Sequence, residues 1–109
     1  MPRSKLRTPE LKQRFDEETK KHPVVLYMKG NTLFPRCGFS AAAVQILQQY
    51  GPVHTVDVLA EPDVRDAIKE YSSWPTIPQA FIRGKFIGGS DIIRDLEERG
   101  ELAAMVKGP

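Results

Sequence analysis

The spacing of apolar and polar residues divides the chain into alternating strands and helices. Residues 24–28 form a continuous apolar run and residues 53–58 are rich in β-branched side chains, and both patterns are typical of strands. Within residues 43–50 and 64–71, apolar side chains instead recur at positions i, i+3, i+4 and i+7, which is the pattern of one helix face. A strand–helix–strand unit followed by another helix is therefore predicted.

Turn and capping residues set the limits of the other elements. Thr8 is a candidate N-cap for a first helix, Arg83-Gly84 is a candidate tight turn between two strands, and Ser90 or Asp91 is a candidate cap for a late helix. On these signals we predict helices over 8–21, 62–71, 90–99 and 101–107 and a hairpin of strands 80–82 and 85–87.

This order of elements predicts an α/β fold with a mixed sheet of about four strands and helices on both faces. We expect one domain over residues 1–109, with residues 1–7 flexible. Ligands of such sheets usually bind at the carboxyl ends of the strands, where loops lead into helices. Cys37 lies in a loop of this kind, between the first strand and the next helix.

Composition and charge narrow the classes of function. Sixteen basic and 14 acidic residues give a net charge of +2, which is too small to predict nucleic-acid binding. No apolar run approaches the roughly 20 residues of a membrane helix, and the first residues lack the apolar centre of a secretory signal. A single cysteine excludes an intrachain disulfide and favours a reducing compartment. We predict the cytoplasm, with the mitochondrial matrix as the alternative.

The setting of Cys37 favours a reactive thiol over a structural one. A helix N-terminus offers free N–H groups and the positive end of a dipole, both of which stabilise a thiolate. Lys29 and Arg36 are near in sequence and would add positive charge. A buried structural cysteine is the alternative, because free cysteine is often buried, but this polar, Gly- and Pro-containing segment does not resemble a core.

The Cys-x-x-Ser spacing limits what this thiol can do. With Ser40 in the second position and no other cysteine, the chain cannot resolve a mixed disulfide by itself. The thiolate could exchange with glutathione or serve as a metal ligand. A 2Fe–2S cluster commonly needs four thiolates, which two chains and two glutathione molecules would supply. Zinc and cysteine-protease chemistry are disfavoured because His22 and His54 have no suitable spacing or motif.

Four blocks in the chain resemble the monothiol glutaredoxins of the Cys-Gly-Phe-Ser class. In order, they are Lys29-Gly30, Cys37-Gly38-Phe39-Ser40, Trp74-Pro75-Thr76-Ile77-Pro78-Gln79 and Gly88-Gly89-Ser90-Asp91. The resemblance extends over about residues 8–106. It implies a thioredoxin-like fold with a four-stranded mixed sheet flanked by about five helices.

The resemblance also implies a glutathione site beside Cys37, formed by Lys29, Arg65, Ile77, Ser90 and Asp91. Lys29 and Arg65 would bind the glycine carboxylate, and Ile77, before a cis Pro78, would pair through its backbone. Ser90 and Asp91 would hold the γ-glutamyl end. Three of these residues also have structural alternatives: Lys29 as a solvated lysine, Arg65 as an exposed helical arginine and Asp91 as a helix cap. Trp74 is expected to support the site. Phe39 is expected to pack beside Cys37, with an exposed face that could meet a partner.

Cluster transfer is the function that the resemblance implies. Two chains would share one 2Fe–2S cluster through Cys37 and glutathione and deliver it to apo iron–sulfur proteins; a heterodimer with a BolA-type protein is a further expectation. Many family members carry a cysteine at the position of Ser90, and in some of them it can form a further disulfide. This chain has only one cysteine, so that disulfide is excluded here. Two alternatives remain: a glutathione-dependent thiol–disulfide oxidoreductase of at most weak activity, and a passive interaction module, which the set of glutathione-site residues disfavours.

Overall fold

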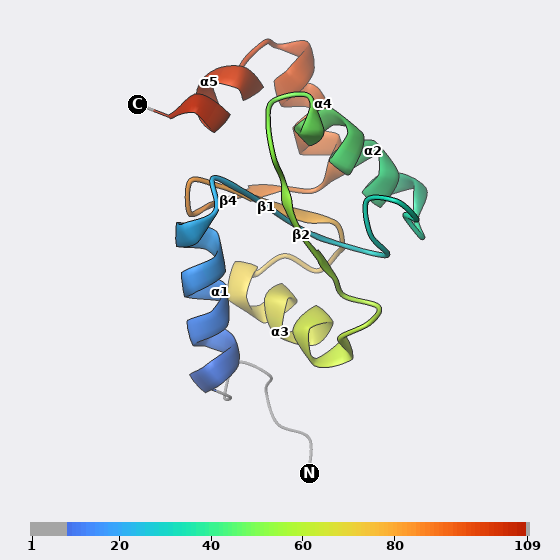
Figure 1. The fold of residues 1–109 in the computed structure, drawn as a ribbon, viewed down its shortest axis with the longest axis vertical. Helices are drawn as coiled ribbons and strands as arrows, with labels where there is room; N and C mark the ends of the chain where they lie inside the picture. Colours follow the sequence, from blue (N-terminus) through green and yellow to red (C-terminus); the bar gives the residue numbers. More distant parts are fainter. Residues whose placement is uncertain (1–8, 109) are drawn as a thin grey trace.

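A computed structural model of the chain describes residues 9–108 and contains one four-stranded sheet between two layers of helices (Figure 1). The predicted flexibility of residues 1–7 and the predicted N-cap Thr8 lie outside the described residues. The elements are α1 (Pro9–Lys21), β1 (Val24–Met28), α2 (Gly38–Gln48), β2 (His54–Asp57), α3 (Pro62–Ser72), β3 (Gln79–Ile82), β4 (Lys85–Gly88), α4 (Ser90–Glu98) and α5 (Leu102–Lys107).

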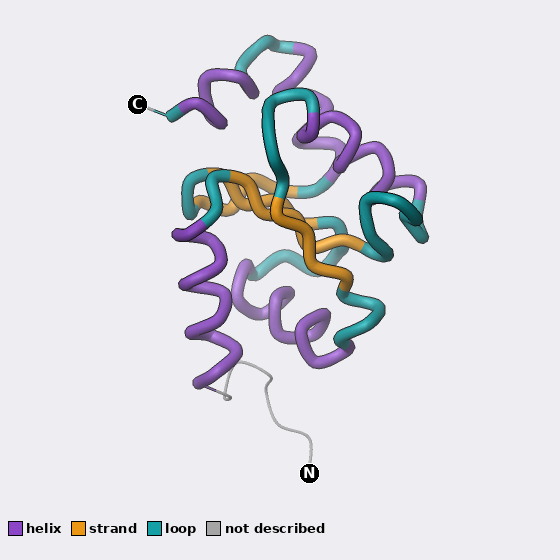
Figure 2. The backbone as a smooth tube through the Cα atoms, viewed as in Figure 1, coloured by secondary structure: helices purple, strands orange, loops and turns teal. Residues whose placement is uncertain are grey.

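The sheet is mixed and has the strand order β2-β1-β3-β4. β1 is parallel to β2 and antiparallel to β3, so that Leu26 lies beside Thr55 on one side and Ala80 on the other. α1 and α3 cover one face of the sheet, and α2, α4 and α5 lie on the other (Figure 2). The predicted α/β architecture with a four-stranded mixed sheet and five helices is confirmed.

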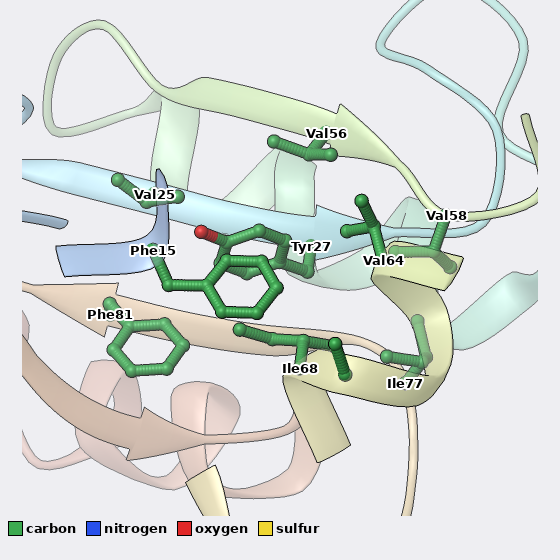
Figure 3. Close-up of a cluster of buried hydrophobic side chains, with 10 residues drawn as sticks. Phe15, Val25, Tyr27, Val56, Val58, Val64, Ile68, Ile77 and Phe81 are labelled. Atoms are coloured by element: carbon green, nitrogen blue, oxygen red, sulfur yellow. The ribbon is translucent and has the colours of Figure 1, made fainter. Parts of the chain in front are cut away.

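The central strand β1 supplies both cores because successive side chains point to opposite faces of a sheet. All five of its residues are buried, as expected for a strand covered on both faces. Val25 and Tyr27 pack with Phe15 and Ile68 on the α1/α3 face (Figure 3). The other three residues of β1 pack on the α2/α4 face, in a cluster that includes Leu47. The end of β1 is thus held from both sides.

One predicted cap differs from the structure, whereas the start of α2 at Gly38, directly after Cys37, is as predicted. The predicted side-chain cap of α4 is wrong: Gly89 occupies the N-cap position, no side chain caps the helix, and Ser90 is its first residue. The two-residue turn at Arg83 and Gly84 is as predicted, with φ values of 54° and 81°. Within residues 9–108, no helix combines the length and apolar character needed to cross a bilayer.

Candidate functional site

Cys37 occupies the N-cap position of α2, where its backbone is extended (φ −152°, ψ 136°). Its side chain does not cap the helix and is partly exposed. The backbone N–H of Ser40 is the main cause that lowers the pKa of the Cys37 thiol, and the Phe39 N–H and the charge of Lys29 act in the same direction. Partial burial opposes them without cancelling them. The thiolate form of Cys37 is therefore favoured at a partly exposed position.

Ser40 links the end of β1 to the start of α2. Its side chain is fully buried, and its hydroxyl oxygen accepts a hydrogen bond from the Lys29 N–H at 3.1 Å. The backbone N–H of the same residue lowers the pKa of the Cys37 thiol. From the sequence alone, Ser40 is predicted only as the residue that stands in place of a second cysteine. Its place in the first turn of a helix was the available signal for this positioning role.

The segment between Lys29 and Cys37 is an ordered loop held by side-chain carboxyl and amide groups. Asp57, at the end of β2, accepts the N–H of Gly30 at 3.0 Å. Asn31 accepts the N–H groups of Leu33 and Phe34 at 3.0 and 2.8 Å. The two apolar side chains nevertheless face solvent, with 81% and 70% of their surface exposed. Sequence reasoning missed the roles of Asp57 and Asn31 in this loop.

A groove of about 460 Å³ lies beside the first turn of α2. Its walls are formed by Phe39, by Trp74, Thr76, Ile77 and Pro78, and by Gly89, Ser90, Asp91 and Ile92. The two later segments approach so closely that a Cβ atom at Gly89 would lie 3.2 Å from the Pro78 carbonyl oxygen. A glycine is therefore suited to this position.

Ile77 presents its backbone to this groove while its side chain is anchored in the core. The side chain belongs to the α1/α3-face cluster and is 8% exposed (Figure 3). The Ile77–Pro78 peptide bond is cis, as expected. Among the described residues, neither the N–H nor the C=O of Ile77 forms a backbone hydrogen bond. An extended peptide in the groove could pair with both groups.

The loop of residues 74–78, before β3, is held by hydrogen bonds from Gln79 and by an aromatic contact of Trp74. Gln79 is fully buried, and its Nε2 donates hydrogen bonds to the carbonyl oxygens of Trp74 and Thr76 at 2.9 and 3.1 Å. The Trp74 ring packs against Phe86 with centroids 5.5 Å apart. Phe39, expected beside Cys37 with one face exposed, is 60% exposed and forms the opposite rim.

The N-terminus of α4 forms the far end of the groove. Ser90 is buried and Asp91 is exposed, and the Asp91 carboxylate is 4.0 Å from Arg94. Because no side chain caps this helix, the N–H groups of its first turn are available to an anion. This end of the groove could therefore accommodate an anion at the N-terminus of α4 and a cation beside the Asp91 carboxylate.

Two of the predicted basic residues do not line the groove. Lys29 lies at the end of β1, where its charge acts on Cys37. Arg65 lies in α3, and its Nε is 3.5 Å from Oδ1 of Asp66. The structure therefore brings Ile77, Ser90 and Asp91 together in one groove, with Cys37 next to its Phe39 rim, and leaves Arg65 outside the groove walls.

Comparisons with known proteins agree on one family. Residues 24–87 match the glutaredoxin family. A monothiol glutaredoxin of Synechocystis sp., described as ycf64-like, is 50% identical over 100 residues, which are 91% of this chain and 94% of the relative. Monothiol glutaredoxin-S15, mitochondrial, of Arabidopsis thaliana is 46% identical over 92% of this chain, which spans 60% of that longer protein. The solution structure of reduced apo GrxS14 from poplar superimposes with a TM-score of 0.81 at 46% identity, covering 92% of this chain and 93% of the other.

Proposed function

Because this chain belongs to the glutaredoxin family and to its monothiol members, we propose that it holds a 2Fe–2S cluster together with glutathione and transfers it to apo iron–sulfur proteins. One observation carries the proposal: the single thiol of the chain, with a lowered pKa, lies two residues before Phe39, which forms one wall of a groove with unpaired backbone groups. Such a thiolate is a good ligand for iron but fills only one coordination position.

The groove supports glutathione as the companion ligand. Glutathione is an extended peptide with a carboxylate at each end, and its cysteine backbone would pair with the N–H and C=O of Ile77. The γ-glutamyl carboxylate would bind the N–H groups at the start of α4, and the neighbouring amino group would bind Asp91. Lys29 is proposed to attract the glycine carboxylate. Arg65 would have to leave Asp66 to reach it.

The donor count requires a second chain. One chain and one glutathione supply two thiolates, and a cluster commonly needs four, so two copies would meet at their Cys37 residues. Lys29 and Arg36, which form no ion pair among the described residues, would offset the negative charge of the four thiolates. A BolA-type protein is the alternative second subunit. We propose a reducing compartment, the cytoplasm, with the mitochondrial matrix as the alternative.

Anaerobic reconstitution with iron, sulfide and glutathione tests the cluster. We expect a coloured species whose native mass equals two chains, one 2Fe–2S cluster and two glutathione molecules. Cys37→Ser should abolish both colour and dimer, whereas Ser40→Ala should retain them because it keeps the thiol. Loss of the cluster in Ser40→Ala with a normal fold, or retention in Cys37→Ser, would refute the assigned ligand.

The lowered pKa of Cys37 also favours a second candidate function, exchange of glutathione mixed disulfides. The Cys37 thiolate would attack the glutathionyl sulfur, form a Cys37–glutathione disulfide and release the substrate thiolate. A second glutathione thiolate would then attack this disulfide, restore the Cys37 thiolate and leave as glutathione disulfide. A colourless monomer that turns over glutathionylated substrates would favour this function.

A further inference from the structure

We propose that Gln79 is a positioning residue for glutathione, because its side-chain amide fixes the loop of residues 74–78 and so holds the Ile77 backbone ready for pairing. This inference rests on the proposed glutathione site. Gln79 itself is fully buried and lies at the start of β3, opposite Tyr27 of β1. It is thus fixed to the centre of the sheet while it reaches back into the loop.

The two hydrogen bonds of Gln79 brace the loop at two points. Nε2 donates to the carbonyl oxygen of Trp74 at 2.9 Å and to that of Thr76 at 3.1 Å. These carbonyls belong to residues that are exposed, so the amide ties this surface loop to the sheet, in addition to the buried Ile77 side chain and the contact of Trp74 with Phe86. The residue that follows Thr76 is Ile77, whose N–H and C=O have no backbone partner among the described residues.

The orientation of the Gln79 side-chain amide, and the unfavourable burial of its oxygen, indicate that this position requires the two N–H donors. Reversing the amide would place Oε1 against two carbonyl oxygens, so the orientation is determined by the network. In the observed orientation Oε1 is buried and has no partner among the described residues. A buried acceptor without a partner is unfavourable, and an apolar side chain of similar size would avoid it. An apolar side chain, however, could not donate the two hydrogen bonds to the carbonyl oxygens of Trp74 and Thr76.

Movement of this loop would disturb the groove on both sides. The Pro78 carbonyl oxygen approaches Gly89 closely enough that a Cβ there would be 3.2 Å away. Gly89 is the N-cap residue of α4, whose first turn forms the far wall. A loop that is no longer braced would therefore displace the pairing edge at Ile77 and loosen its contact with the α4 wall.

Gln79→Met tests the proposal because it keeps the size of the side chain but removes both donors. The measurement is the equilibrium of Cys37 with glutathione disulfide, compared with its equilibrium with 2-hydroxyethyl disulfide, which has no peptide to bind. We expect the glutathione equilibrium to fall about tenfold, the scale of losing two ordering hydrogen bonds, while the 2-hydroxyethyl equilibrium stays unchanged. Gln79→Leu, which also lacks both N–H donors, should show the same selective loss.

Leu102→Ala is the matched control for a general loss of stability, because it removes buried volume in α5, which contributes no residue to the groove walls. It should leave both equilibria unchanged. If Gln79→Met keeps the glutathione preference, or lowers both equilibria equally, the positioning role of Gln79 is refuted. Retention of the wild-type equilibrium by Gln79→Leu would refute the role of the donors. If the wild-type chain itself shows no preference for glutathione, the proposed function fails instead.

Discussion

At the residue scale, the reactivity of Cys37 is set mainly by backbone geometry. The Ser40 N–H lowers the pKa of the thiol most, and the nearby charge of Lys29 adds to this effect. The position of the thiol between a strand and a helix could be predicted from the local sequence. The hydrogen bond from the Lys29 N–H to the Ser40 hydroxyl could not, because it joins residues eleven positions apart through the folded turn.

Lys29→Met should raise the pKa of the Cys37 thiol, because the cation that favours the thiolate is removed. At pH 7 the thiolate fraction then falls, and alkylation by iodoacetamide should slow by about threefold. Above the pKa values of both proteins the two rates should converge. The pH profile of alkylation gives both results directly.

Lys20→Met is the control, since it removes one charge from the exposed surface of α1. Its alkylation profile should match that of the wild type. If Lys29→Met also leaves the profile unchanged, the lysine charge does not act on the thiol.

At the scale of single elements, some features follow from the local sequence, and others depend on how the chain folds around them. The apolar periods predicted the helices and strands, and the Arg83-Gly84 pair predicted the hairpin turn. The cap of α4 was predicted wrongly because Ser90 is buried as the first helical residue, against its preference for a capping position. The role of Asp57 escaped prediction because the pairing of β1 with β2 brings the loop that it binds to it from 27 positions away. The role of Gln79 escaped it because its partners, three and five residues earlier, belong to a loop without a regular backbone pattern.

Gly84→Ala tests the turn between β3 and β4. The φ of Gly84 is 81°, and a side chain there would meet only an ordinary contact, so the change acts through backbone strain. We expect the free energy of unfolding to fall by about 1 kcal/mol, measured by urea denaturation.

Gly38→Ala serves as the comparison because this glycine has open space around it and lies in the first turn of α2. It should be neutral or slightly stabilising, as alanine favours the helix. Equal destabilisation by both changes would contradict the importance of the turn geometry.

At the scale of the whole molecule, one strand unites two cores. Ile68 is buried on the α1/α3 face and Ile93 on the α2/α4 face, and β1 contributes to both clusters. Ile68→Val and Ile93→Val should each lower the free energy of unfolding by about 0.5–1.5 kcal/mol. Because the sheet separates the sites, the double variant should show the sum of the two losses.

Thermal and urea unfolding of the double variant, followed by circular dichroism and by tryptophan fluorescence, should give one coincident transition. Two separate transitions would show that the faces unfold independently. That result would contradict the view that β1 couples them.

The pairing of β1 with β3 has a consequence for the chain while it is being made. Cys37 leaves the ribosome before the segment of residues 74–92, which forms most of the groove walls, has been synthesised. In that interval β3 is missing, and the sulfur has neither the groove nor the complete sheet beside it. The thiol of the nascent chain is therefore exposed to oxidants and metal ions before the groove exists. A preference of the thiol for one of these reactants that depends on the groove arises only when the second half of the chain has folded.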